Sequence, residues 1–426
     1  MIVIYNLIQL LGLALLWPLL ALLVACRAKY RLRIPARLGR GLGGLAAKIP
    51  GGRPRIWIHA LSVGEVSSSL TLVHAIRRHF PGAVLLFSAS TSSGERYARA
   101  VPGLPVDLFI PFPLDVYPVV RRFVQRVRPD LFILVETDFW PNFLQRLAAE
   151  NIPALLVNGR ISQKSYSKYS FFQPFFLPMF SSFAALAMQR AEDVEKMVAL
   201  GVAAAKVKNL GNLKYDAMAP LIRPPQPGGR KEQGLPVDRT ILIAGSTHEG
   251  EEEMVCRIFQ QLAVDFPGLF LIIAPRNIER GPAVLKLVRQ KGLGASCRSA
   301  ATQDDGQVMV LDTMGELAGL YRLADLAFVG GSLVAAGGHN PLEPAAAGVP
   351  VLFGPHMEDF ADVVDDMLAT GCAVQAGSAE ELAGRLRFYL ANGAERKQQG
   401  EAARKFVEAR RGVSMRHIDL IRQVLP

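Results

Sequence analysis

The sequence has few cysteines, and no two of them lie close together. The four cysteines of the 426-residue chain stand at positions 26, 256, 297 and 372. This spacing provides neither a disulfide framework nor the paired thiolates of a zinc site. We therefore expect the protein to work in a reducing compartment, and the sequence predicts neither a metal site nor a cofactor.

Common phosphate-binding fingerprints are also missing. No GxGxxG turn joins a predicted strand to a predicted helix, and no GxxxxGK[ST] sequence occurs. These absences disfavour an ordinary dinucleotide site and a P-loop.

Acidic residues are absent from residues 27–64, where nine lysines and arginines lie. The formal net charge of the chain is +11, and without these nine charges it is +2. A nearly neutral body with one basic segment does not resemble a nucleic-acid surface, and no zinc-finger, RNP or basic-zipper pattern accompanies it. No nucleic-acid partner is therefore expected.

The segment before the basic residues has no charge at all. Residues 2–26, IVIYNLIQLLGLALLWPLLALLVAC, would extend about 37 Å as a helix, compared with about 30 Å for a hydrocarbon core. This predicts a membrane anchor over residues 1–26. Asn6, Gln9 and Pro18 weaken the case for a straight spanning helix, so a spanning and a partly embedded anchor both stay open.

The charges that follow the apolar segment bear on its orientation. Basic residues on its C-terminal side predict that the body lies on the cytoplasmic face of the membrane. A cleaved export signal is the alternative, because LVAC at 23–26 resembles a lipoprotein processing box. The length of the run and the absence of a basic residue ahead of it favour a retained anchor.

Beyond residue 54 the chain alternates between short apolar runs and helical periodicity. RIWIHAL (55–61), AVLLFSAS (83–90) and DLFILVE (130–136) predict buried strands, and LTLVHAIRRHF (70–80) predicts a helix. The alternation indicates parallel sheets covered by helices.

A change of composition divides this pattern in two. Residues 219–238 contain five prolines and three glycines, which is typical of a linker. We predict an α/β protein with two Rossmann-like domains, 27–218 and 239–426, and a ligand cleft between them. The last helix is free to pack back on the first domain.

Polar motifs follow many of the predicted strands. They are SVGE (62–65), ETDFWPN (136–142), NGR (158–160), GNLKYD (211–216), GSTHEGEE (245–252), APRNIER (274–280), DTMGEL (312–317) and GGHNPLE (337–343). Since the carboxyl ends of parallel strands share one edge of a sheet, the motifs predict a site for a large polar substrate.

Two glutamates in the first half are candidates for catalysis. Glu65 has the spacing of a capping-box partner for Ser62, and it could equally serve as a general base. Glu136 ends an apolar strand, where an unpaired carboxylate is costly, so Lys214 or Arg160 is expected to pair with it. A structural and a catalytic ion pair both remain open.

The second half offers an anion site. Asn340, Pro341 and Glu343 suit the N-cap, the first residue and the capping-box carboxylate of a helix whose N-terminus could bind phosphate. His248 could bind phosphate or cap a helix, and Arg276 could clamp an anion or remain a surface charge. Glu249, Glu251, Glu252 and Glu253 are interpreted as favourable charges in a first helical turn rather than metal ligands.

Taken in order, these motifs resemble those of the 3-deoxy-D-manno-octulosonic acid (Kdo) transferases of lipopolysaccharide assembly, membrane-anchored glycosyltransferases of the GT-B fold. The resemblance runs almost from end to end. It is most specific in DTMGELAGLYRLADLAFVGGSL (312–333) and GGHNPLEPAAAGVPVLFGPH (337–356). The motifs depart from the family pattern at Asp138, Phe139 and Ile278. These departures leave details of the acceptor open, but they do not affect the reaction that the resemblance implies.

The resemblance implies inverting transfer of Kdo from CMP-Kdo to the lipid A precursor (lipid IVA), at the cytoplasmic face of a bacterial inner membrane. It implies that Glu65 is the proton acceptor and that Glu136 and Lys214 support the transition state. The residues that it places in the CMP site are Pro275, Arg276, Met314, Gly315, Glu316, Asn340, Pro341, Leu342 and Glu343, and His248 is added from its position. The alternatives are a GT-B-fold nucleotide-sugar epimerase and a non-catalytic membrane-bound nucleotide-sugar receptor.

Overall fold

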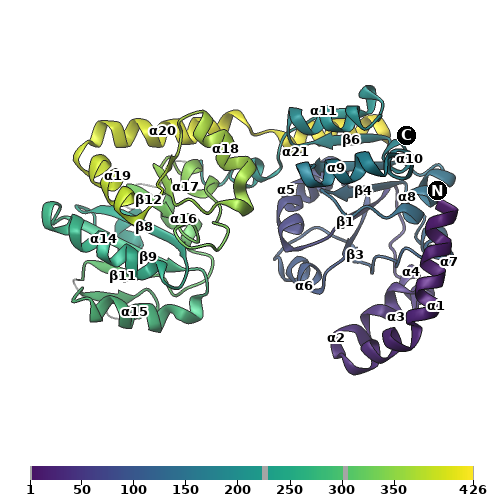
Figure 1. Cartoon of the computed structure of the whole chain (residues 1–426), viewed down its shortest axis with the longest axis horizontal. Helices are drawn as coiled ribbons and strands as arrows, with labels where there is room; N and C mark the ends of the chain where they lie inside the picture. Colours follow the sequence, from purple (N-terminus) through teal and green to yellow (C-terminus); the bar gives the residue numbers. More distant parts are fainter. Residues whose placement is uncertain (1, 223–228, 301–305, 426) are drawn as a thin grey trace. The chain divides into compact units, whose positions relative to one another are not determined.

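The computed structural model describes residues 2–222, 229–300 and 306–425. They form two compact units (Figure 1). The N-terminal unit runs to Ala217 and takes up the chain again from Gly412, while the C-terminal unit is Met218–Arg411. The last helix, α21 (Val413–Val424), therefore belongs to the N-terminal unit, where Figure 1 draws it in yellow.

The N-terminal unit is built on a seven-stranded sheet in the order β3-β2-β1-β4-β5-β6-β7, and every neighbouring pair is parallel. The strands are β1 (Arg55–Ala60), β2 (Val84–Ala89), β3 (Leu108–Phe109), β4 (Leu131–Val135), β5 (Ala154–Gly159), β6 (Ala185–Met188) and β7 (Val207–Asn209). The three strands predicted at 55–61, 83–90 and 130–136 are thus confirmed.

Helices cover both faces of this sheet. They are α4 (Leu42–Ala46), α5 (Val63–His79), α6 (Ser92–Ala100), α7 (Tyr117–Val127), α8 (Pro141–Ala149), α9 (Gln163–Phe171), α10 (Gln173–Ser181), α11 (Ala191–Ala199), α12 (Lys214–Ala217) and α21. Alternate side chains of β1 enter two different cores, with Trp57 in one and Ile56 and Ile58 in the other. Burial on both faces explains why the strands read as continuous apolar runs.

The C-terminal unit repeats this architecture with a second parallel sheet in the order β10-β11-β9-β8-β12-β13-β14. Its strands are β8 (Thr240–Thr247), β9 (Leu269–Pro275), β10 (Ala295–Cys297), β11 (Val308–Val310), β12 (Leu326–Val329), β13 (Val351–Phe353) and β14 (Val374–Gln375). Its helices are α13 (Gly229–Glu232), α14 (Glu251–Asp265), α15 (Gly281–Gln290), α16 (Leu317–Tyr321), α17 (Leu342–Ala346), α18 (Ala361–Ala369), α19 (Ala379–Ala391) and α20 (Gly393–Ala409). The expected linker contains α13, and its residues 223–228 lie outside the described residues.

The chain begins with three further helices, α1 (Ile2–Cys26), α2 (Ala28–Arg31) and α3 (Arg33–Arg37). The window Ile2–Leu19 of α1 has a mean hydropathy of 1.9 and is not buried inside the protein. By length and composition, α1 is able to cross a membrane.

Candidate active site

Glu65 and Glu136 lie where the strand order of the N-terminal sheet reverses. β1 and β4 are neighbours, and the chain continues outward from them in opposite directions. Glu65 is in the first turn of α5, directly after β1, and Glu136 directly follows β4. Ligands of open α/β sheets bind at such a switch point. The sheet thus brings together two carboxylates that are 71 positions apart in the sequence.

The Glu65 carboxylate is buried, with 6% of the residue exposed. Its Oε2 accepts a hydrogen bond of 2.5 Å from the Leu61 backbone N–H, and its Oε1 accepts one of 3.2 Å from the Thr137 hydroxyl. Burial raises the pKa of Glu65 to about 8, and the charges of Glu136 and Asp138 add to the shift. The group therefore exchanges its proton close to neutral pH, as a general base requires.

The capping box predicted for Ser62 and Glu65 is not formed. The Ser62 side chain makes no cap hydrogen bond, and Glu65 reaches the N–H of Leu61 instead of that of Ser62. The prediction was wrong because the carboxylate turns toward Thr137, a neighbour supplied by the loop after β4.

Glu136 is held by several groups from neighbouring elements. Its Oε1 accepts from the Ser68 hydroxyl at 3.1 Å and from the Asn158 side-chain amide at 3.0 Å. Arg160, one of the two cations expected as its partner, places Nε 3.5 Å from Oε2. Glu136 and Asn158 both have left-handed backbones, with φ of 60° and 55°. Such conformations are uncommon outside glycine and concentrate at functional sites.

Asn158 also connects Glu136 to the segment that carries Lys214. Its side-chain oxygen accepts from the Leu213 N–H at 2.9 Å, and the Lys214 N–H donates to Asn212 at 3.0 Å. Asn158, which binds Glu136, thus also holds Leu213, the residue directly before Lys214 and α12. Asn158 was missed as a site residue, although its NGR motif directly follows the apolar part of β5.

The C-terminal sheet has its own switch point between β8 and β12. His248 follows β8, and its Nε2 lies 2.8 Å from Nε2 of His339, in the loop after β12. Arg276 follows Pro275, the last residue of β9, and its backbone N–H donates to Thr247 at 3.0 Å. Burial lowers the pKa of His339 to about 4, and the positive charge of Arg276 adds to this shift.

Glu343 shares this electrostatic environment. Burial raises its pKa, while the hydrogen bond from Asn340 and the charge of Arg276 oppose the rise. His248, Arg276 and Glu343, three residues singled out in the sequence, therefore lie at one edge of one sheet. His339, beside them, was missed, although it belongs to the GGHNPLE motif.

The helix start predicted at Asn340 is displaced by one residue. α17 begins at Leu342, with Pro341 rather than Asn340 as its N-cap. The Asn340 side chain bonds the first two residues of α17. Its oxygen accepts from the Leu342 N–H, and its amide donates to Glu343 Oε1 at 3.2 Å. Glu343 thus bonds the Asn340 side chain, where a capping box would use the backbone N–H.

Glu251 has a larger role than the first-turn charge that the sequence indicated. The residue is fully buried, and its carboxylate accepts four backbone hydrogen bonds. The donors are the N–H groups of His248, Gly331, Ser332 and Leu333, at 3.2, 2.7, 3.1 and 2.9 Å. Glu251 therefore fastens the loop after β12 to the loop after β8 and shapes the backbone next to His248 and His339.

Comparisons with known proteins agree with this geometry. Residues 32–217 match the family model of the 3-deoxy-D-manno-octulosonic-acid transferases (kdotransferases), and residues 292–406 match glycosyl transferases group 1. The 3-deoxy-D-manno-octulosonic acid transferase of Haemophilus influenzae is 33% identical over 404 residues, which are 93% of this chain and 92% of that protein. The chain belongs to the Kdo transferase family. It is a glycosyltransferase.

Solved structures confirm the GT-B architecture expected of a Kdo transferase. The UDP-GlcNAc 2-epimerase of Neisseria meningitidis has a TM-score of 0.62 at 10% identity, over 87% of this chain and 100% of its own. MurG of Acinetobacter baumannii has a TM-score of 0.55 at 14% identity, again over 87% and 100%. At these identities the likeness shows the fold and not the reaction.

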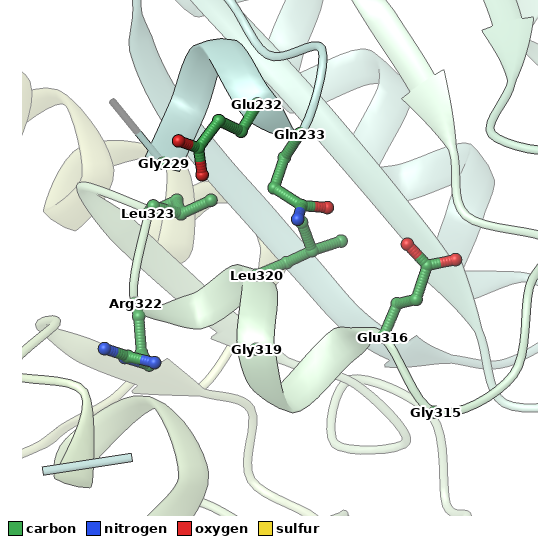
Figure 2. A pocket seen from close by; sticks show the side chains of 9 residues that line it. All are labelled: Gly229, Glu232, Gln233, Gly315, Glu316, Gly319, Leu320, Arg322 and Leu323. Atoms are coloured by element: carbon green, nitrogen blue, oxygen red, sulfur yellow. The ribbon is translucent and has the colours of Figure 1, made fainter. Parts of the chain in front are cut away.

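The remaining predicted donor residues of this Kdo transferase, Met314, Gly315 and Glu316, lie just before α16. Met314 is 81% exposed, Gly315 has a φ of 85°, and Glu316 pairs with Arg298 at 3.0 Å. A cavity of about 310 Å³ opens beside them (Figure 2). It is lined by Gly229, Glu232, Gln233, Gly315, Glu316, Gly319, Leu320, Arg322 and Leu323. In Figure 2, Glu232 and Gln233 reach toward it from one side, and Leu320 and Glu316 border the other.

Among residues 2–222, 229–300 and 306–425, no group of three or more His, Cys, Asp or Glu side chains is placed to hold a metal ion.

Proposed function

We propose that this Kdo transferase moves Kdo from CMP-Kdo to the lipid A precursor, lipid IVA. The N-terminal unit would bind the acceptor and the C-terminal unit the donor. The observation that carries the proposal is the buried Glu65 carboxyl at the switch point of the N-terminal sheet, with a pKa of about 8. A carboxylate at this position is suited to accept a proton from a substrate hydroxyl.

The proposed reaction is a direct displacement. The acceptor hydroxyl oxygen attacks the anomeric carbon of Kdo, and its proton passes to the Glu65 carboxylate. The bond from this carbon to the phosphate oxygen of CMP breaks, and CMP departs with the electron pair. The negative charge of Glu136 raises the basicity of Glu65. Lys214 would support the transition state from the start of α12.

The donor site proposed in the C-terminal unit combines cationic and polar groups. Arg276 and His248 would bind the phosphate of CMP. Asn340, Pro341, Leu342 and Glu343 would meet the nucleotide at the start of α17, with Glu343 accepting hydrogen bonds from ribose hydroxyls. Pro275 sets the position of Arg276, and Met314, Gly315 and Glu316 would complete the site beside the cavity of Figure 2.

The overall assignment can be tested with purified protein, CMP-Kdo and lipid IVA. The lipid product should gain the mass of Kdo, and each transfer should release one CMP. Release of CMP without any change in the lipid would contradict the acceptor assignment and leave the donor site standing.

Replacing Arg276 with alanine should weaken CMP binding about 10- to 150-fold. This range corresponds to the loss of a charge-assisted hydrogen bond, about 1.5–3 kcal/mol. Calorimetric titration with CMP measures the change. The substitution should also raise the pKa of His339, followed by NMR, because Arg276 is one of the charges that lower it.

Arg257 provides a matched control for this substitution. It is an exposed arginine on α14 of the same unit, and Arg257→Ala should leave CMP affinity unchanged. Equal affinities in both variants and the wild type would remove Arg276 from the donor site.

We further propose that the protein is held at the inner membrane with its body on the cytoplasmic face. α1 supplies the apolar segment, and the nine basic residues of 27–64 suit the anionic surface of that leaflet.

Deleting residues 1–26 should release the protein from membranes at high salt, because only the screened attraction of the basic residues would remain. The full-length chain should stay bound under the same conditions. Sedimentation of membranes in low and high salt measures this, and a truncated chain that pellets fully in high salt would show that the attachment lies elsewhere.

A further inference from the structure

The first turns of α1 are joined to the body of the N-terminal unit by polar side chains. The Tyr5 hydroxyl donates to Asp115 Oδ2 at 3.0 Å, and the Gln9 amide donates to the Asp115 backbone oxygen at 3.1 Å. The Asn6 side-chain oxygen accepts from the Asn142 amide at 2.7 Å. Residues 5, 6 and 9 share one face of the helix, so this face of α1 is turned toward the body.

The chain that follows α1 is joined to the same unit. In α3, Arg33 Nη2 donates to the backbone oxygens of Ala89 at 2.9 Å and Ser90 at 2.5 Å. Arg37 Nε donates to the backbone oxygen of Phe112 at 2.9 Å. α3 is therefore held against the ends of the strands β2 and β3, so that the first turns of α1 and the chain beyond its C-terminal end are fastened to one body.

The rest of α1 is apolar and exposed. In its first turns the exposed side chains lie opposite Tyr5, Asn6 and Gln9, and from Leu15 onward they lie on all sides of the helix. The residues with more than half of their surface exposed are Val3, Ile4, Leu7, Ile8, Leu10, Leu11, Leu15, Leu16, Trp17, Leu19 and Leu22. Nothing in the described chain covers these side chains. A row of this length needs an apolar environment, which a bilayer supplies.

We propose that α1 does not cross the bilayer but lies in the plane of one leaflet, with the face of Tyr5, Asn6 and Gln9 docked on the body. A spanning helix would carry its N-terminus to the far side of the membrane. This would break the contacts to Asp115 and Asn142 and leave three polar side chains in or beyond the hydrocarbon. The docked arrangement satisfies these side chains and keeps the apolar face in lipid.

A neighbouring helix pair extends the same surface. The ring of Phe175 in α10 lies 5.7 Å from that of Tyr5. At the end of α9, Phe171 and the following Phe172 are 80% and 49% exposed. Exposed Phe side chains are suited to the boundary between the lipid headgroups and the acyl chains.

The charge of this region matches an anionic leaflet. The exposed Lys164 and Lys168 lie on α9, and no Asp or Glu occurs between residues 151 and 191 or between 27 and 64. Basic residues near a bilayer surface are attracted to anionic lipids. The occupant of the surface is therefore a leaflet that contains anionic lipid.

The inference rests on the membrane attachment proposed above, and its test separates the two. The full-length protein carries one protease-cleavable tag at each end and is assayed in inverted membrane vesicles and in spheroplasts. The C-terminal tag reports which face holds the body, and the N-terminal tag reports whether α1 crosses. We expect protease to cut both tags from the same face.

An N-terminal tag that is cut from the face opposite to the C-terminal tag, or from neither face without detergent, would overturn the in-plane orientation. The proposal that the membrane holds the protein would survive that result. Protein missing from the washed membranes would instead overturn the attachment itself.

A triple variant tests the polar contacts. With Tyr5→Phe, Asn6→Leu and Gln9→Leu, α1 becomes long and apolar enough to span without its docking contacts, and part of the N-terminal tags should move to the opposite face. A control with Ile4→Leu, Leu7→Ile and Ile8→Leu on the exposed face should keep both tags together. If the triple variant behaves like this control, the three polar side chains do not set the orientation, and that part of the proposal is wrong.

Discussion

Glu65→Gln is expected to slow Kdo transfer at least about a hundredfold while the protein folds and binds CMP as before. A neutral amide cannot accept the proton of the attacking hydroxyl, and general bases typically contribute about 10²–10⁴ to the rate. The amide does fit the local hydrogen bonds. Its oxygen can accept from the Leu61 N–H, and its NH₂ can donate to the Thr137 hydroxyl, which is free to rotate. Single-turnover transfer to the lipid acceptor measures the rate.

The pH dependence of Kdo transfer by the wild type should reflect the ionisation of Glu65. Because the base acts in its ionised form and the pKa of Glu65 is about 8, the transfer rate should rise with pH through that region. Asp138, whose charge adds to this shift, provides a second probe, since Asp138→Asn should move the midpoint downward.

Stability should respond to pH in the opposite direction. The pKa of Glu65 lies above the ordinary 4.5, so between about pH 4.5 and 8 the folded chain holds a proton that the unfolded chain has lost. Folding then becomes less favourable as the pH rises through this interval. Since glutamine cannot ionise, the Gln variant should melt no lower than the wild type at pH 8. If the Glu65→Gln variant transfers Kdo at a rate near that of the wild type, Glu65 is not the base, and Glu136 becomes the next candidate.

Glu251→Gln should instead lower the stability of the C-terminal unit substantially, although Glu251 takes no part in proton transfer. Each oxygen of the wild-type carboxylate accepts two backbone N–H groups. An amide supplies only one oxygen, so two buried donors would face an NH₂ group. Unsatisfied buried donors cost about 1–3 kcal/mol each, which predicts a loss of about 2–6 kcal/mol in the unfolding free energy of the C-terminal unit.

Denaturant unfolding and CMP titration of the same preparation test this prediction. CMP affinity should fall as well, because the loop after β12 leads to His339 and Asn340. The matched control is Glu253→Gln, two residues along α14, whose exposed side chain pairs with Lys291 at 2.6 Å. A surface pair of this kind contributes about 0–1 kcal/mol. If the two variants unfold alike, the carboxylate of Glu251 does not fasten the loop.

The fold was predictable because its strands are buried on both faces. A strand such as β1 needs apolar side chains at successive positions, and the run RIWIHA is readily distinguished from the helical period that follows it. The ends of the strands, and with them Glu65, Glu136, His248 and Arg276, could be placed on the edges of the two sheets for the same reason.

The hydrogen-bond partners of these groups were less predictable. The spacing of Ser62 and Glu65 indicated a local capping box, yet the carboxylate bonds Thr137, which is 72 positions away. Asn158 was overlooked because an asparagine after a strand is common and only its contacts with Glu136 and Leu213 distinguish it. Glu251 was interpreted as one of several helix-start charges, since the sequence does not show which of them turns inward.

By itself, the sequence determined two parallel-sheet domains, the family of the chain, the edge of each sheet that carries the polar motifs, and an uncharged segment able to enter a membrane. These properties follow from local composition and order, because apolar runs and turn motifs act over a few residues. Only the tertiary structure decided that Tyr5, Asn6 and Gln9 dock on Asp115 and Asn142 and that Glu251 fastens a loop about 80 positions away. A buried polar group forms its hydrogen bonds with whichever groups the fold brings within about 3 Å. These partners can be far apart in the sequence, so their positions along the chain do not reveal the contact.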